Sequence, residues 1–177
     1  DLAGHLQPLG TPGQIMPVQA NVRYPASLAA ACDGAFAVIN LTGVLASGGA
    51  QSFDAVHVFG AEASAKAARA AKARMFIQMS AIGADENSAS AYGKSKAEGE
   101  KLARAAFPGT IVLRPSVVFG PEDDFFNRFA SLSRFAPALP LIGGGETRFA
   151  PVFVGDVAEA AALGAAWAAD FLAIGGG

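Results

Sequence analysis

Short apolar runs alternate along this chain with segments of helical periodicity. Strands are predicted for the runs at residues 14–18, 35–41, 75–79, 110–114 and 151–154. Helices are predicted at residues 25–34, 53–73, 90–107 and 123–136, and a last helix is expected to begin with Asp156 as its cap and Glu159 in a capping box. Such alternation is typical of βαβ units, so we expect an α/β fold with a parallel sheet and right-handed crossovers.

Composition narrows the class of protein further. With 177 residues, 52% of them hydrophobic and 16% charged, the chain has the profile of one ordinary globular domain. The 13 basic and 15 acidic residues are scattered, which argues against a nucleic-acid partner. One cysteine, Cys32, allows no internal disulfide, and His5 and His57 make no metal-ligand cluster with it, so we expect no metal.

Neither a membrane span nor a signal peptide is predicted. The longest uncharged run, residues 34–53, contains amides, hydroxyls and several glycines that would be poorly placed in hydrocarbon. The opening stretch DLAGHLQPLG has no basic region followed by an apolar core, and it lacks an initiator Met. We therefore expect a processed or truncated product.

The residues that follow the predicted strands are the first place to look for a ligand site. In an open parallel sheet, ligands bind beyond the carboxyl ends of the strands. Small and hydroxyl residues dominate there, at 21–23, 42–43, 80–83 and 115–118. Thr42 and Gly43 would let a ribose or phosphate come close to the backbone. The same residue types favour any strand-to-helix turn, so a ligand site and a plain turn both stay open.

Tyr92 and Lys96 lie four residues apart near the start of a predicted helix, and therefore on one face of it. An ammonium held near a phenol favours the phenolate, which would make Tyr92 a usable acid or base near neutral pH. The alternative is a packed ring beside a solvated charge, because Y-x-x-x-K is a short motif.

A longer ordered string carries a resemblance to a known family. NVR, INLTG, FIQMSAIGAD, YGKSK and LRPSVVFGPED follow one another in this order between residues 21 and 123. The string resembles the extended and atypical short-chain dehydrogenase/reductase superfamily, which is NAD-dependent epimerase/dehydratase-like. More narrowly, the chain is similar from about residue 14 to 165 to the branch that holds the NAD(P)H-binding accessory subunit of respiratory complex I and its bacterial relatives.

The resemblance implies a Rossmann-like, doubly wound parallel sheet in three layers, with NAD or NADP as cofactor and NADPH slightly favoured. It implies that Asn21 and Val22 border the adenine ring. The turn that borders the adenosine ribose and phosphates would be formed by Leu41, Thr42 and Gly43.

The resemblance also implies a catalytic centre. Tyr92 would exchange the hydroxyl proton, while Lys96 would orient the nicotinamide ribose and lower the pKa of Tyr92. The segment beside the nicotinamide carboxamide would be formed by Pro115, Ser116, Val117 and Val118. Hydride would move to or from the nicotinamide ring.

The chain departs from the family at its start. The family opens with a strand, a G-x-x-G-x-x-G loop and a helix, and no such motif follows any predicted strand here; the glycines at 47–50 and 143–147 have neither its spacing nor its context. We therefore expect the first strand–helix–strand unit to be missing. Residues 1–177 would form a single partial NAD(P)-binding domain, with 136–151 as a connector to a truncated C-terminal substrate region.

A second departure concerns the hydroxyl that polarises the substrate carbonyl in the family. Its position falls on Ala81, and Ser80 lies one residue earlier, where the side chain of an extended segment points to the other side. Ser80 is kept as a catalytic candidate. His57 takes a place where the extended family often has Asn, and a packed or surface imidazole is expected there. The aromatic stripe of the 123–136 helix is expected in the core.

Three functions are therefore carried forward. The first is an oxidoreductase in which Tyr92 and Lys96 transfer a proton alongside hydride transfer. The second is a non-catalytic accessory or assembly subunit of a respiratory NADH:quinone oxidoreductase that keeps a bound dinucleotide. The third is a cofactor-sensing regulator. The expected location is cytoplasmic, or peripheral at the inner membrane if a respiratory complex is the partner.

Overall fold

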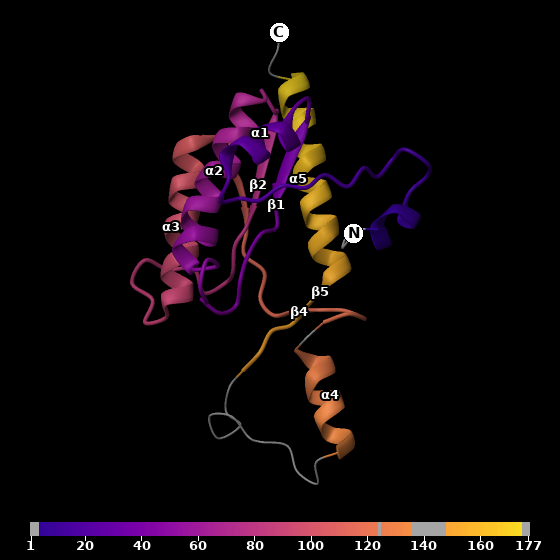
Figure 1. Ribbon diagram of the computed structural model, residues 1–177, viewed down its shortest axis with the longest axis vertical. Helices are drawn as coiled ribbons and strands as arrows, with labels where there is room; N and C mark the ends of the chain where they lie inside the picture. Colours follow the sequence, from indigo (N-terminus) through magenta and orange to yellow (C-terminus); the bar gives the residue numbers. More distant parts are fainter. Residues whose placement is uncertain (1–3, 124, 136–147, 175–177) are drawn as a thin grey trace.

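A parallel sheet of three strands forms the centre of the protein. The computed structural model describes residues 4–123, 125–135 and 148–174 (Figure 1). The strands are β1 (Ala37–Asn40), β2 (Met75–Met79) and β3 (Ile111–Leu113), paired in the order β1-β2-β3. Both pairings are parallel, with Ile77 opposite Ile39 on one side and Ile111 on the other. The three strands predicted for this region are confirmed.

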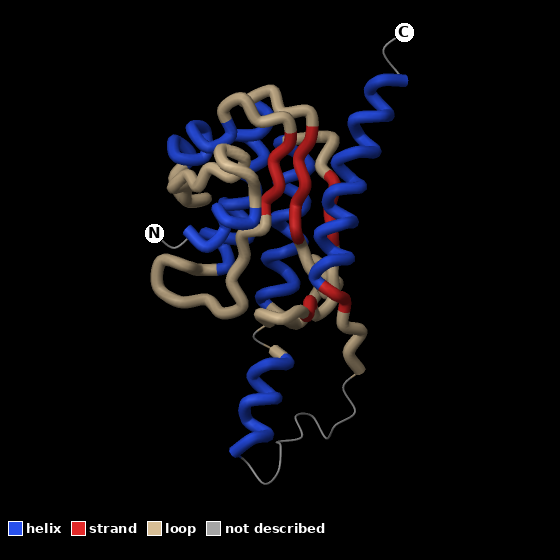
Figure 2. The backbone as a smooth tube through the Cα atoms, turned by 90° about the vertical axis from the view of Figure 1, so that its right-hand side faces the viewer, coloured by secondary structure: helices blue, strands red, loops and turns tan. Residues whose placement is uncertain are grey.

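Helices cover both faces of the sheet. On one face lie α2 (Phe59–Ala70) and α3 (Ala91–Ala106), with α1 (Pro25–Cys32) beside α2; α5 (Val154–Ile174) lies on the other face (Figures 1 and 2). The central strand is covered on both sides, and Phe76 and Ile77 are fully buried. A strand in that position needs a mostly apolar run, which explains why MFIQM was predicted with the correct bounds. The three-layer α/β arrangement is confirmed.

Small residues allow α2 and α3 to pack closely. Ala61, Ala65, Ala68 and Ala103 form a buried cluster with Phe76 beneath them. Close approach is also visible at the start of α2, which a single π-helical turn, η2 (Asp54–Val58), precedes. A Cβ added at Gly99 of α3 would overlap the backbone carbonyl oxygen of His57 in this turn. The helix predicted at residues 53–73 thus exists, with a π turn at its start.

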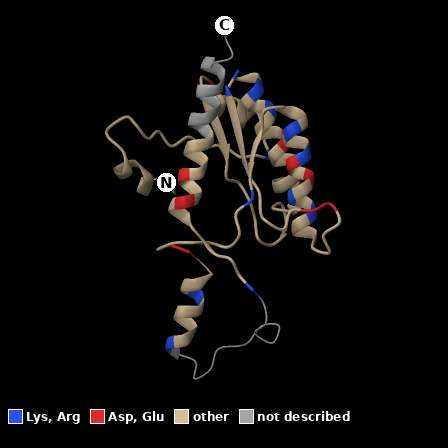
Figure 3. Ribbon diagram, turned by 180° about the vertical axis from the view of Figure 1, so that it is seen from behind, with Lys and Arg blue, Asp and Glu red and all other residues tan. Residues whose placement is uncertain are grey.

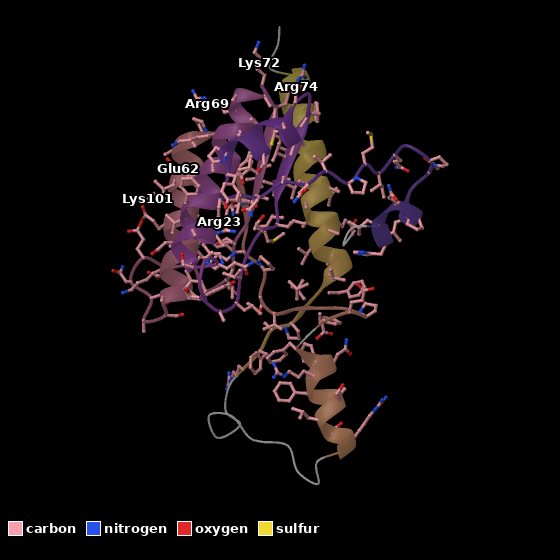
Figure 4. All side chains as sticks on the ribbon, in the orientation of Figure 1. Arg23, Glu62, Arg69, Lys72, Arg74 and Lys101 are labelled. Carbon is pink, nitrogen blue, oxygen red and sulfur yellow. The ribbon has the colours of Figure 1, made fainter. Side chains whose placement is uncertain are left out.

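Charged side chains lie on the outer side of the same helical layer. Lys and Arg are interspersed with Glu along α2 and α3 (Figure 3). Glu62, Arg69 and Lys101 project away from the sheet (Figure 4). Glu62 forms an i,i+4 ion pair with Lys66, at 2.6 Å between Oε1 and Nζ. This face is therefore the solvated side of the layer.

A second, two-stranded parallel sheet follows β3. It pairs β4 (Val118–Phe119) with β5 (Val152–Phe153), and α4 (Phe126–Phe135) lies between them in sequence. The strand at β5 and the helix at α4 were predicted, whereas β4 was not. β4 exists only through its pairing with a distant segment, which no local pattern reveals.

Two predictions are wrong, and one lies outside the described residues. Residues 15–20 are irregular, not a strand: Pro17 has no N–H to donate, and the described residues provide no strand to pair with this run. α5 begins at Val154, so Asp156 lies within its first turn and is not its cap. Most of the connector predicted at 136–151 falls on residues 136–147, which are not described.

In the described part of the chain, no helix is long and apolar enough to cross a membrane.

Candidate functional site

The carboxyl ends of the three strands meet at one edge of the sheet, and a cavity of about 1220 Å³ opens there. Its wall includes residues from all three strand ends: Leu41 after β1, Ser80 to Gly83 after β2, and Pro115 to Val118 after β3. Tyr92 and Lys96 reach the same cavity from α3. This is the place where open parallel sheets bind ligands.

Tyr92 and Lys96 are adjacent, as their spacing predicted. Tyr92 is in the first turn of α3, and the Nζ of Lys96 lies 5.7 Å from the centroid of its ring. The Lys96 side chain is buried, and Nζ donates a hydrogen bond to the carbonyl oxygen of Met79 at 3.4 Å. The pair is therefore fixed between α3 and the end of β2.

Burial is the main cause of the pKa shifts of both Tyr92 and Lys96. Burial raises the pKa of the Tyr92 phenol above its usual value. The lowering of this pKa that was expected from Lys96 is therefore not found in the protein alone. Burial also lowers the pKa of Lys96, and the carboxylate of Glu100, one turn further along α3, acts in the opposite direction. The phenol is consequently neutral at neutral pH and can act as a proton donor.

Ser80 carries the one buried side-chain polar atom that lacks a hydrogen-bond partner within the described residues. The residue is 5% exposed, and its Oγ is buried without a partner. Its backbone N–H donates to the carbonyl oxygen of Leu113 at 2.7 Å, which holds the segment in line with β3. Because buried hydroxyls are normally paired, a hydroxyl of this kind at a cavity wall fits a ligand that supplies the partner.

The loop after β1 is anchored by a buried amide pair that the sequence did not reveal. Asn40 and Gln78 are register partners on β1 and β2, and the Asn40 Nδ2 donates to the Gln78 Oε1 at 2.9 Å. The other amide atom of Asn40, Oδ1, accepts from the backbone N–H of Thr42 at 3.1 Å. This fixes Thr42 and brings Gly43 over Lys96: a Cβ at Gly43 would lie 3.3 Å from Nζ. The loop thus offers backbone close to the buried ammonium.

Four predicted residues are not part of the cavity wall: Thr42 and Gly43 in the loop just described, and Asn21 and Val22. Val22 is buried in a core cluster with Leu28 and Cys32, and it packs against Gly60 at the start of α2. Asn21 organises the turn before α1: its Oδ1 accepts from the N–H of Arg23 at 3.0 Å. The structure therefore brings Tyr92, Lys96, Ser80 and the segments after β1 and β3 together, and places Asn21 and Val22 in the neighbouring turn.

His57 lies closer to the candidate site than the sequence indicated. It is 3% exposed, and its Nε2 accepts a hydrogen bond from the backbone N–H of Val44 at 3.0 Å. Its Nδ1 lies 2.9 Å from the Oγ of Ser95. Its ring stacks on Phe53 and meets the Tyr92 ring edge-on. The expectation of a packed imidazole is thus confirmed, although the ring adjoins the candidate catalytic tyrosine.

The far wall of the cavity is apolar. It is formed by Phe125, Phe149, Val154 and Val157, with Arg148 and Asp123 as the charged residues on that side. Contrary to the prediction of a core stripe, Phe125 and Phe126 are 36% and 39% exposed. The Phe125 ring contacts Phe149, with centroids 5.5 Å apart. Part of the aromatic stripe therefore lines the cavity.

Fold and site together define a Rossmann-like protein with a cavity at the carboxyl ends of its strands. Residues 3–108 match the family described as NAD(P)H-binding, and residues 83–170 match the 3-beta hydroxysteroid dehydrogenase/isomerase family. The chain therefore belongs to the NAD(P)H-binding family, and its fold is the one seen in epimerase/dehydratase-like proteins. The family match confirms the expected class of cofactor, NAD or NADP.

Individual relatives and one solved structure illustrate the match. The mitochondrial NADH dehydrogenase [ubiquinone] 1 alpha subcomplex subunit 9 of Mus musculus is 37% identical over 156 residues, which is 88% of this chain and 41% of the relative. The ceramide reductase of Caulobacter vibrioides is 37% identical over 134 residues, 76% of this chain and 42% of the relative. The chain thus spans about two fifths of the length of these relatives.

A dTDP-glucose 4,6-dehydratase of Streptomyces venezuelae, solved with NAD bound, shares the fold: its TM-score is 0.69 at 21% identity, over 85% of this chain and 54% of that one.

Proposed function

We propose that the protein is an NAD(P)(H)-dependent oxidoreductase that interconverts a carbonyl and a hydroxyl group. One observation carries this proposal: Tyr92, Lys96 and the partnerless hydroxyl of Ser80 border a single cavity at the strand ends. A neutral phenol, a buried ammonium and a free hydroxyl are the groups that protonate and polarise a carbonyl oxygen.

In this proposal each side chain has one task. Bound NAD(P)H supplies the hydride that reduces the carbonyl carbon. Tyr92 donates its phenolic proton to the carbonyl oxygen, and Lys96 stabilises the phenolate that results. Ser80 donates a hydrogen bond to the same oxygen. The loop at Thr42 and Gly43 would hold the ribose and phosphates.

The segment Pro115–Val118 would border the nicotinamide in this arrangement. It is half-buried and lines the cavity. Its ends are fixed from both sides: the carbonyl oxygen of Pro115 accepts from the N–H of Ile82, and that of Val117 accepts from the N–H of Val152, each at 3.0 Å. A rigid, mostly apolar segment of this kind can support a ring against the reacting side chains.

The far wall favours an apolar substrate. Phe125, Phe149 and Val157 can bury a hydrocarbon group, and Arg148 and Asp123 are the charged residues beside them. The similarity to a ceramide reductase points in the same direction. We therefore infer that the reacting carbonyl is carried by a molecule with an apolar chain or ring.

The test is NADPH- and NADH-dependent reduction of a panel of ketones that differ in apolar length, measured with the full-length protein. Tyr92→Phe should lower kcat by about 10²-fold or more, because the proton donor is lost. The only other tyrosine, Tyr24, is exposed and is not among the residues that line the cavity, so Tyr24→Phe is the matched control and should retain full activity. Equal turnover by the wild type and Tyr92→Phe would overturn the catalytic assignment.

A second function has its own support. The relatives named as NADH dehydrogenase subunits favour a non-catalytic accessory subunit that keeps a dinucleotide for stability. Ala81, at the position where the family has a hydroxyl, fits this alternative as well. Stoichiometric co-purification with a large membrane complex, together with cofactor exchange that is slow compared with any turnover, would favour it over the enzyme.

A further inference from the structure

His57 is joined by hydrogen bonds to two separate parts of the site. The π turn η2 directs its ring inward, where it is 3% exposed. Phe53 lies parallel to it, with ring centroids 5.2 Å apart, and the Tyr92 ring meets it at 89° with centroids 5.3 Å apart. These two rings fix the plane of the imidazole, and each of its nitrogens lies beside its own partner.

The partners determine which nitrogen carries the proton. The backbone N–H of Val44 can only donate, so Nε2 accepts that bond at 3.0 Å. A neutral imidazole then has its proton on Nδ1, which donates to the Oγ of Ser95 at 2.9 Å. The Ser95 hydroxyl in turn donates to the carbonyl oxygen of Tyr92 at 2.8 Å. Three bonds, each with a defined direction, connect the loop after β1 to the first turn of α3.

The two connected parts are those that the proposed function uses. Val44 follows Thr42 and Gly43, the loop assigned to the ribose and phosphates. Gly43 lies between the two basic side chains: a Cβ there would be 3.3 Å from Lys96 Nζ and 3.7 Å from His57 Nε2. If the Val44 bond were lost, the loop would be free to shift relative to Lys96, because the remaining described anchor is the bond from Thr42 to Asn40.

We propose that His57 is a positioning residue that fixes the dinucleotide loop at residues 42–44 to the Tyr92–Lys96 helix through Ser95. This inference rests on the proposed binding of a dinucleotide at this edge of the sheet. The neutral form is the one that can accept from Val44, and burial together with the nearby Lys96 ammonium lowers the pKa of His57 to about 4. The connection is therefore intact at neutral pH.

The experiment is a titration of the full-length protein with NADPH and NADH, followed by the fluorescence of the reduced nicotinamide. His57→Phe keeps a ring for Phe53 and Tyr92 but removes both hydrogen bonds, and should weaken binding about tenfold, as expected for one or two ordinary hydrogen bonds. Ser95→Ala breaks the second half of the connection and should weaken binding by a smaller factor. The double variant should bind no more weakly than His57→Phe, since both changes interrupt one chain of bonds.

Two controls separate positioning from stability. Val56→Ala removes buried apolar volume from the same π turn, so it should lower the melting temperature while leaving both dissociation constants unchanged. His57→Gln presents a carbonyl oxygen to Val44, so it should recover part of the affinity lost in His57→Phe. If His57→Phe does not fold, the comparison is made with His57→Gln and Ser95→Ala instead.

The outcomes are distinct. A wild-type protein that binds neither nucleotide refutes the proposed function and this inference with it. A wild type that binds, together with a His57→Phe that binds equally well, overturns the inference alone. A Val56→Ala that loses as much affinity as His57→Phe also overturns it, because the effect would then be one of stability.

Discussion

Arg114 holds the carboxylate of Glu100 with two hydrogen bonds, from Nε to Oε1 at 2.9 Å and from a terminal nitrogen to Oε2 at 2.6 Å. The Glu100 side chain is 6% exposed and that of Arg114 49%. Bidentate pairs of this kind are strong and directional. This pair joins α3 to the residue just before Pro115, and so links the helix that carries Tyr92 to the segment that would border the nicotinamide.

Replacing Glu100 by Gln should lower the free energy of unfolding by about 1–3 kcal/mol, because one half of a largely buried, hydrogen-bonded pair is lost while Arg114 can still reach water. Urea unfolding at pH 7 measures this. Lys101→Met is the matched control, since it breaks the exposed pair with Glu98 and should cost less than about 0.5 kcal/mol. Equal losses in the two variants would contradict the account of the Glu100–Arg114 pair.

The folded protein should lose stability as the pH falls from about 6.5 toward 4. His57 is neutral in the fold, with a pKa of about 4, whereas in the unfolded chain it takes up a proton near pH 6.5. In that window the unfolded state binds more protons, so its free energy falls relative to that of the fold. The loss totals roughly 3 kcal/mol from this group, and it levels off below pH 4.

Unfolding free energies measured by urea between pH 4 and 7.5 test this expectation. His57→Phe should remove most of this slope, while His5→Phe, at an exposed site, should leave it unchanged. An identical slope in the wild type and His57→Phe would show that other groups cause the acid sensitivity.

Phe149 tests the apolar wall. Its ring lines the cavity and contacts Phe125. Phe149→Ala should raise KM for an apolar ketone about fivefold to tenfold, through lost burial of substrate, with little change in kcat. Leu132 is exposed on α4 and is not among the residues that line the cavity, so Leu132→Ala should leave KM unchanged. A rise in KM that is equal for short and long ketones would argue against an apolar binding wall.

The pattern of apolar residues along the chain predicted the elements that are buried along their own length. The run at residues 75–79 is mostly apolar because β2 is covered on both faces, with Gln78 as its one polar residue, and its bounds are correct. The run at 14–18 has a similar appearance, but it is irregular in the structure, since a strand needs a neighbour to pair with and Pro17 offers no N–H. The short strand β4 depends on a partner 34 residues away, and no local signal announces it.

The same distinction applies to the candidate site. The spacing of Tyr92 and Lys96 placed them on one helical face, and both reach the cavity. The role of His57 could not be predicted, because its partners Val44 and Ser95 are 13 and 38 residues away in the sequence. The direction of the Tyr92 pKa was predicted wrongly for the protein by itself: burial outweighs the charge of Lys96, and burial is a property of the fold.

The most direct test of the central claim, a dinucleotide held beside Tyr92 and Lys96, is the affinity of the full-length protein for NADPH and NADH in two lysine variants. Lys96→Met removes the buried ammonium at the cavity, and Lys94→Met removes an exposed one two residues earlier on the same helix. We predict nucleotide binding by the wild type and Lys94→Met, and binding at least about tenfold weaker in Lys96→Met. Unchanged affinity in Lys96→Met would contradict the claim.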